Sequence, residues 1–177
     1  MAASTTAAHV PGKRGDLGGF WALITTQAQG AFNDNLYRFV IGFYMVHHYA
    51  TTKGEADSSV TMMLTGLGAV LFAVPYLAFP GLAGALSDRY SKRTVTIATK
   101  MWEVMVMLVG ALAFVLGNPY LIFFMLYLMF MQSAFFSPAK YGILPELLPE
   151  KSLSWGNGIL GMTTFVAIIA GQLVAGF

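Results

Sequence analysis

The chain of 177 residues contains no cysteine, and only 10% of its residues are charged. Without cysteine it has no disulfide bridge, no thiol nucleophile and no cysteine-based metal site. Hydrophobic residues make up 56% of the sequence, whereas a soluble domain carries about 25% charged residues that cover its water-facing surface. The composition therefore predicts a protein that crosses a membrane several times.

Histidine and net charge are also scarce, with three histidines and a formal charge of +2. His9 lies in a polar amino-terminal segment, and His47 and His48 end the first apolar run. An intramembrane enzyme needs a nucleophile beside a base, or a histidine and acid cluster on facing helices, and the apolar runs contain neither pattern. We therefore expect no metal site, no cofactor and no nucleic-acid partner, and an enzyme is the least favoured function.

Five apolar runs follow a polar segment over residues 1–19, where we expect a disordered cytoplasmic tail. The first run is too long, and too polar at its centre, for a cleavable signal peptide. Proline should bend the second helix at Pro75 and Pro80 and should end the fourth. The runs predict membrane helices over residues 20–47, 60–87, 94–116, 120–138 and 154–177.

The first predicted helix carries polar residues at its centre. At about 100° per residue, Gln27, Asp34 and Arg38 fall within about 40° of one another, and Asn35 lies beside them. A charge at the centre of a membrane costs about 2.5–3.5 kcal/mol on insertion scales, so this face should look into protein or a wet cavity. We predict that these four residues line a substrate cavity. The alternative is a structural ion pair between Asp34 and Arg38, which are i,i+4 neighbours.

Two lysines lie farther along the chain. Lys100 and Glu103 share one face of the third predicted helix and should form a structural ion pair, with a place on the cavity wall as the alternative. Lys140 follows the fourth predicted helix in a Ser-Pro-Ala-Lys-Tyr-Gly run over residues 137–142 and should lie at the inner mouth of the bundle.

The positions of lysine and arginine predict the orientation. One basic residue, Lys53, falls in a loop expected outside, and cytoplasmic loops are the ones that collect lysine and arginine. The amino terminus should therefore be cytoplasmic. Seven of the ten basic residues fall on the expected inside: Lys13, Arg14, Arg89, Lys92, Arg93, Lys140 and Lys151.

A charged turn over residues 84–93 joins the second and third predicted helices. Its pattern, Gly-x-x-x-Asp-Arg-x-x-Lys-Arg, resembles the corresponding loop of the major facilitator superfamily, although the commonest version has glycine at the position of Ser91. The resemblance implies that the motif governs conformational switching rather than substrate binding. Its residues are Gly84, Asp88, Arg89, Lys92 and Arg93.

A closer resemblance rests on three further stretches: Phe-Asn-Asp-Asn over residues 32–35, Ser-Pro-Ala-Lys-Tyr-Gly-Ile-Leu over 137–144, and Asn157-Gly158. Together they resemble the lysophospholipid transporter family, whose members flip lysophospholipids across the bacterial inner membrane. The resemblance implies that Asp34 and Lys140 line the path of the lipid head group. Pro145, Pro149 and Arg38 depart from the family pattern, and Arg38 places a cation beside Asp34.

Facilitators have twelve helices in two halves, each built from inverted three-helix repeats. Five predicted helices imply a truncated amino-terminal half, whose partners would be membrane lipid, a carboxy-terminal half for alternating access and, by analogy with fused relatives, an acyltransferase. Another facilitator, exporting a drug or small solute, is the alternative function. The polar first helix suits it equally well, but the Ser-Pro-Ala-Lys-Tyr-Gly run does not.

Overall fold

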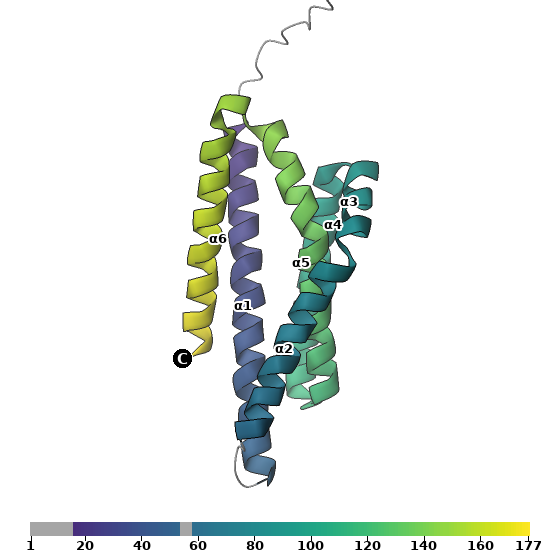
Figure 1. The fold of residues 1–177 in the computed structure, drawn as a ribbon, viewed down its shortest axis with the longest axis vertical. Helices are drawn as coiled ribbons and strands as arrows, with labels where there is room; N and C mark the ends of the chain where they lie inside the picture. The colour runs from purple at the N-terminus through teal and green to yellow at the C-terminus, as the bar shows by residue number, and fades with distance from the viewer. Residues whose placement is uncertain (1–15, 54–57) are drawn as a thin grey trace, which may run out of the picture.

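The computed structural model describes residues 16–53 and 58–177, and the regular structure in these ranges is helical. Figure 1 shows a bundle of long helices that run roughly antiparallel, with successive connections at opposite ends. The elements are α1 (Leu17–Lys53), α2 (Ser58–Ala78), α3 (Pro80–Arg89), α4 (Lys92–Val115), α5 (Pro119–Leu147), the 3₁₀ turn η1 (Glu150–Ser152) and α6 (Leu153–Ala175).

Hydropathy and length identify the elements that can cross a membrane. In the described ranges, α4, α5 and the segment Glu150–Ala175 are long and apolar enough, and the bent pair α2 and α3 makes a fourth if the pair is counted as one span. These spans agree with the predicted all-α membrane protein. The polar centre of α1 keeps that helix out of this group, so a count of five spans stays a prediction.

The packing is organised around α1 and α5. Helix α6 lies along α1, helix α4 lies along α5, and α5 also contacts α1, α2 and α3. Two apolar clusters hold these helices together. One contains Tyr37, Ile41 and Met129, and the other contains Phe20 and Leu144. Because α1 joins one cluster at its amino-terminal end and the other from Tyr37 onward, its polar residues 27–35 lie between the two clusters.

The second predicted helix is bent at Pro80, as predicted, and the bend is a break that divides it into two helices. Helices α2 and α3 meet at 48°, and the break falls at Phe79, immediately before Pro80. Proline is well suited to the first turn of a helix, where its missing N–H is not needed. Pro75, in contrast, lies inside α2. Helix α3 continues to Arg89, so the charged turn is shorter than predicted and consists of Tyr90 and Ser91.

The predicted end of the fourth helix at residue 138 is wrong. Helix α5 continues through Pro138 and Pro145 to Leu147. Interior prolines are tolerated in membrane helices where neighbouring elements satisfy the freed backbone groups. The helix ends instead before Pro149, because a following proline drives Leu148 to the extended conformation that the structure shows, with φ −117° and ψ 145°.

The predicted amino-terminal tail is shortened. Residues 17–19 belong to the first turn of α1, and the Asp16 carboxylate accepts a hydrogen bond from the Gly19 N–H at 2.9 Å. A carboxylate at this place stabilises a helix start. The predicted tail over residues 1–15, and the acidic part of the first loop over 54–57, lie outside the described residues.

The turn between α4 and α5 falls where the predicted helices over residues 94–116 and 120–138 leave a gap. Gly117 has a positive φ of 61°, a conformation that suits glycine. The Asn118 side chain caps α5 by accepting from the Leu121 N–H at 3.2 Å, and Pro119 occupies the first turn. Ser91 performs the same capping role for α4, accepting from the Thr94 N–H at 3.1 Å. Ser91 stands where the commonest version of the resembled loop motif has glycine, and here it caps the amino-terminal end of α4.

Candidate functional site

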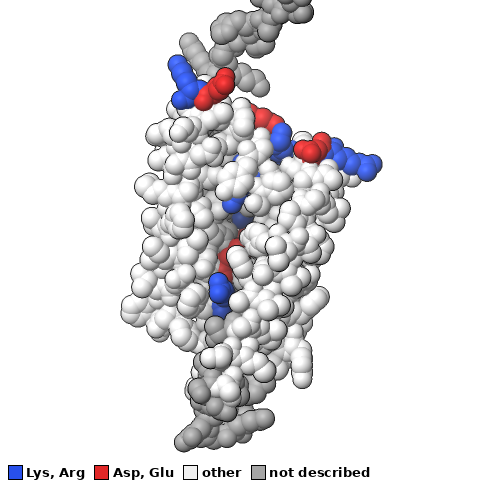
Figure 2. Space-filling view, in the orientation of Figure 1, with Lys and Arg blue, Asp and Glu red and all other residues white. Residues whose placement is uncertain are grey.

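A polar cavity of about 190 Å³ lies midway along the bundle. All five residues predicted to bind substrate contribute to its wall, which is further lined by Lys100 and by aromatic side chains of α2 and α5. Figure 2 shows charged atoms of both signs in the middle of the face, where the surrounding surface is uncharged, and further charged groups at the upper end of the bundle. The predicted residues on the wall are Gln27, Asp34, Asn35, Arg38 and Lys140.

Asp34 is held by α5 rather than by Arg38. Its Oδ2 atom accepts a hydrogen bond from Ser133 Oγ at 2.5 Å. The other oxygen, Oδ1, is buried and receives no hydrogen bond from the described part of the chain. The Arg38 guanidinium lies 5.8 Å from the centre of the Phe72 ring, and the ion pairs within residues 16–53 and 58–177 join other residues. The alternative of an Asp34–Arg38 ion pair is therefore wrong for this structure.

Lys140 belongs to the body of α5, not to a loop beyond it. Its ammonium lies 5.0 Å from the centre of the Tyr141 ring, and its side chain reaches the same cavity as Asp34. The sequence prediction ended the helix at Pro138, and it therefore placed Lys140 beyond the helix, at the inner mouth of the bundle. A continuous helix instead carries Lys140 on the cavity wall within the bundle.

Two amides of α1 connect the cavity wall to α6. Gln27 Nε2 donates to Thr164 Oγ1 at 3.2 Å, and Asn35 Oδ1 accepts from Gln172 Nε2 at 3.4 Å. Asn35 also donates to the Ala31 carbonyl oxygen at 2.8 Å. These bonds orient the amides, so both can present fixed donors and acceptors to a polar ligand.

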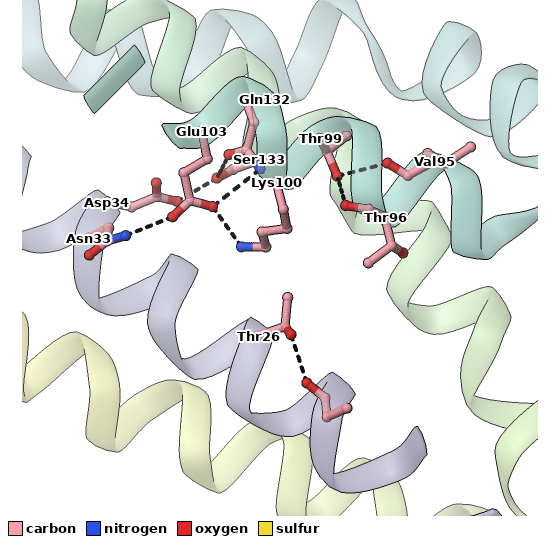
Figure 3. A network of polar contacts seen from close by, with 11 residues as sticks. Thr26, Asn33, Asp34, Val95, Thr96, Thr99, Lys100, Glu103, Gln132 and Ser133 are labelled. Atoms are coloured by element: carbon pink, nitrogen blue, oxygen red, sulfur yellow. Dashed lines mark hydrogen bonds and ion pairs between the residues drawn. The ribbon is translucent and has the colours of Figure 1, made fainter. Parts of the chain in front are cut away.

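A second polar group joins three helices beside the cavity (Figure 3). The Glu103 carboxylate of α4 pairs with Lys100 at 2.6 Å and accepts from Asn33 of α1 at 2.8 Å. Gln132 of α5 donates to it at 3.5 Å, and Ser133 connects this group to Asp34. The side chain of Glu103 is 4% exposed and that of Lys100 is 20% exposed. The buried carboxylate thus accepts hydrogen bonds from three side chains, those of Asn33, Lys100 and Gln132.

The switch motif lies at a different place, at the end of the bundle where α3 meets α4. Lys92 pairs with Glu146 of α5 at 2.5 Å, while Asp88, Arg89 and Arg93 are exposed. Gly84 lies within α3. None of these residues belongs to the cavity wall.

Sequence reasoning missed Ser133 as the partner of Asp34. The available signal was the pair Gln132 and Ser133 at the centre of an apolar helix, because polar side chains in a span face protein or a cavity. It also missed Glu146, whose link to Lys92 depends on α5 extending past Pro145. The aromatic residues of the cavity wall, Phe72, Tyr76 and Phe130, could not be identified in advance, because in the sequence they look the same as aromatic residues that face lipid.

The chain is similar to curated proteins named lysophospholipid transporter LplT. It is 30% identical to the one from Photorhabdus laumondii over 160 residues, which cover 90% of this chain and 36% of the relative. It is 31% identical to the one from Klebsiella pneumoniae over 159 residues, 89% of this chain and 36% of the relative. For Escherichia coli strain HS the identity is 29% over 160 residues, 89% of this chain and 36% of the relative.

These relatives confirm the resemblance to lysophospholipid transporters. The chain spans about a third of the length of the curated relatives it matches. No model of a known protein family matches the chain, and no solved structure matches it.

Proposed function

We propose that the chain forms part of a lysophospholipid transporter of the bacterial inner membrane and that its polar cavity receives the lipid head group. The observation that carries the proposal is Asp34, which lines the cavity together with Lys140 and whose buried Oδ1 atom has no donor within residues 16–53 and 58–177. Leaving a buried acceptor unsatisfied costs about 1–3 kcal/mol, more for a charged group. A ligand with an ammonium group would supply the donor.

Each part of a zwitterionic lysolipid has a suitable partner in the cavity. The ammonium suits Asp34, and the phosphate suits a cation such as Lys140. The amides of Gln27 and Asn35 can bond the glycerol hydroxyl and ester oxygens. A single acyl chain can lie against the aromatic side of the cavity, which includes Phe72 and Phe130, or remain in the bilayer.

Transport would require alternating access against a second half of the protein, with the switch motif at the inner end of the helices. The exposed carboxylate of Asp88 is available to a helix amino terminus, which attracts anions. Another facilitator, with a drug or small solute as cargo, remains the second candidate, because the polar face of α1 suits such cargo too.

The test of the proposed function is specific crosslinking of a photoreactive lysophosphatidylethanolamine to the chain in lipid nanodiscs. We expect crosslinks on cavity residues that excess unlabelled lysophosphatidylethanolamine suppresses. Suppression by an amphipathic cationic drug but not by the lysolipid would overturn this proposal and favour the drug exporter.

We further propose that the amino terminus is cytoplasmic. The α3–α4 turn, flanked by Arg89, Lys92 and Arg93, and the η1 turn, which contains Lys151, lie at the same end of the bundle (Figure 1). An excess of basic residues at one end is typical of the cytoplasmic side. Because the chain has no cysteine, single cysteines can report accessibility. A membrane-impermeant maleimide added outside should label Asn118→Cys and not Ser91→Cys, and the reverse result would contradict the orientation.

A further inference from the structure

Lys100 is not confined to the ion pair that its sequence position suggests. It pairs with Glu103 at 2.6 Å, yet it also lines the polar cavity together with Asp34 and Lys140. Glu103 does not contribute to that cavity wall. In this pair the carboxylate of Glu103 is buried, whereas Lys100 contributes to the wall of the cavity.

Gly30 of α1 makes this position of Lys100 possible. A Cβ atom placed on Gly30 would lie 2.5 Å from Lys100 Nζ, closer than non-bonded atoms approach. On the opposite side, the Lys100 ammonium lies 4.8 Å from the centre of the Phe136 ring, a favourable position for a cation. The missing side chain on α1 and the aromatic face on α5 together hold the ammonium at the cavity.

Glu103 can tolerate a move of Lys100 toward a ligand. Removing the partner of a buried charge is normally costly, but Asn33 and Gln132 both donate to the Glu103 carboxylate independently of Lys100. The lysine also carries three donor hydrogens, so it can bond an anion while keeping one bond to Glu103. The carboxylate thus holds the lysine in place without occupying all of its donors.

The charges of the cavity wall favour an anionic group near Lys100. The wall carries three cationic residues, Arg38, Lys100 and Lys140, against one acidic residue, Asp34. We propose that Lys100 is a specificity-determining residue of the cavity that binds the phosphate of the lysolipid. The proposal rests on the proposed function, and it assigns to Lys100 a ligand role in place of a purely structural one.

The experiment compares two competitors of photoreactive lysolipid crosslinking, lysophosphatidate and a monoacylglycerol with the same acyl chain. These two lipids differ only in the phosphate. The ratio of the concentrations at which each halves the crosslinking therefore measures recognition of the phosphate. Lys100→Met should lower the preference for lysophosphatidate about tenfold, since hydrogen bonds to charged groups contribute about 1.5–3 kcal/mol. Gly30→Ala should act in the same direction by displacing the ammonium.

Two further variants keep the test decisive. Lys100→Met combined with Glu103→Gln removes both charges of the pair, so the test remains possible if the single variant does not fold. Gly158→Ala is the matched glycine control, because a Cβ there has nothing within 4 Å, and its preference should equal that of the wild type.

The outcomes separate this inference from the proposed function. Equal weakening of both competitors, with the preference for lysophosphatidate unchanged, would make Lys100 structural and overturn the inference alone. Absence of any competition by lysolipid in the unmodified chain would overturn both.

Discussion

Replacing Asp34 by alanine is expected to abolish specific crosslinking of lysophosphatidylethanolamine to the cavity. The substitution removes the buried acceptor Oδ1 and leaves the lipid ammonium without a counter-charge. Truncating one partner of a buried charge pair costs about 2–5 kcal/mol, so affinity should fall at least about thirtyfold. Lys140→Ala should have a comparable effect through the phosphate, and Asp34→Glu should retain part of the binding because the charge remains.

Matched variants separate this role from scaffolding. Ser133→Ala removes the hydrogen bond to Asp34 Oδ2 while keeping the carboxylate, so it should weaken binding less than Asp34→Ala. The double variant Asp34→Asn with Arg38→Gln should remain defective. Normal crosslinking in that double variant would show that Asp34 serves only to neutralise Arg38, and the site assignment would then be wrong.

Among single alanine substitutions in the two ion pairs, Glu103→Ala is expected to cause the larger loss of stability. The carboxylate is buried, and its removal leaves the Lys100 ammonium, Asn33 and Gln132 without their common acceptor. Breaking a buried ion pair in this way costs about 3–5 kcal/mol. Thermal unfolding of the detergent-solubilised chain should show a markedly lower midpoint for Glu103→Ala.

The second ion pair of the described chain supplies the control. Lys92 and Glu146 are separated by 2.5 Å but are 29% and 54% exposed, and such surface pairs contribute about 1 kcal/mol or less. Glu146→Ala should therefore shift the midpoint little. The double variant Glu103→Gln with Lys100→Met should recover much of the stability. Equal losses for Glu103→Ala and Glu146→Ala would contradict the assignment of Glu103 to a buried network.

The polar wall of the cavity could be predicted from sequence because lipid penalises polar side chains strongly. Helical periodicity groups Gln27, Asp34 and Arg38 on one face of α1, and the penalty predicts that this face turns away from lipid. The structure places all three residues on the cavity wall. Nothing local in the sequence, however, identifies which partner Asp34 takes. Arg38 is closer along the chain, but Ser133, from a helix 99 residues away, makes the hydrogen bond.

Helix ends were harder to predict in α5 than in α4. The capping residue Ser91 and the turn at Gly117 act through their immediate neighbours, so the sequence determines them locally. Pro138 has two possible outcomes, termination or continuation with one hydrogen bond fewer, and tertiary packing decides between them. That decision moved Lys140 from an expected loop into the helix that lines the cavity.

The polarity of α1 has a consequence for how the protein is made. A helix with charges at its centre is a poor substrate for membrane insertion by itself. The groups that satisfy it are synthesised much later, since Ser133 follows Asp34 by 99 residues and Thr164 follows Gln27 by 137. The hydrogen bonds that hold the polar centre of α1 can therefore form only after α5 and α6 have been synthesised. We therefore expect α1 to reach its final place in the bundle only after α5 and α6, although α1 is translated before them.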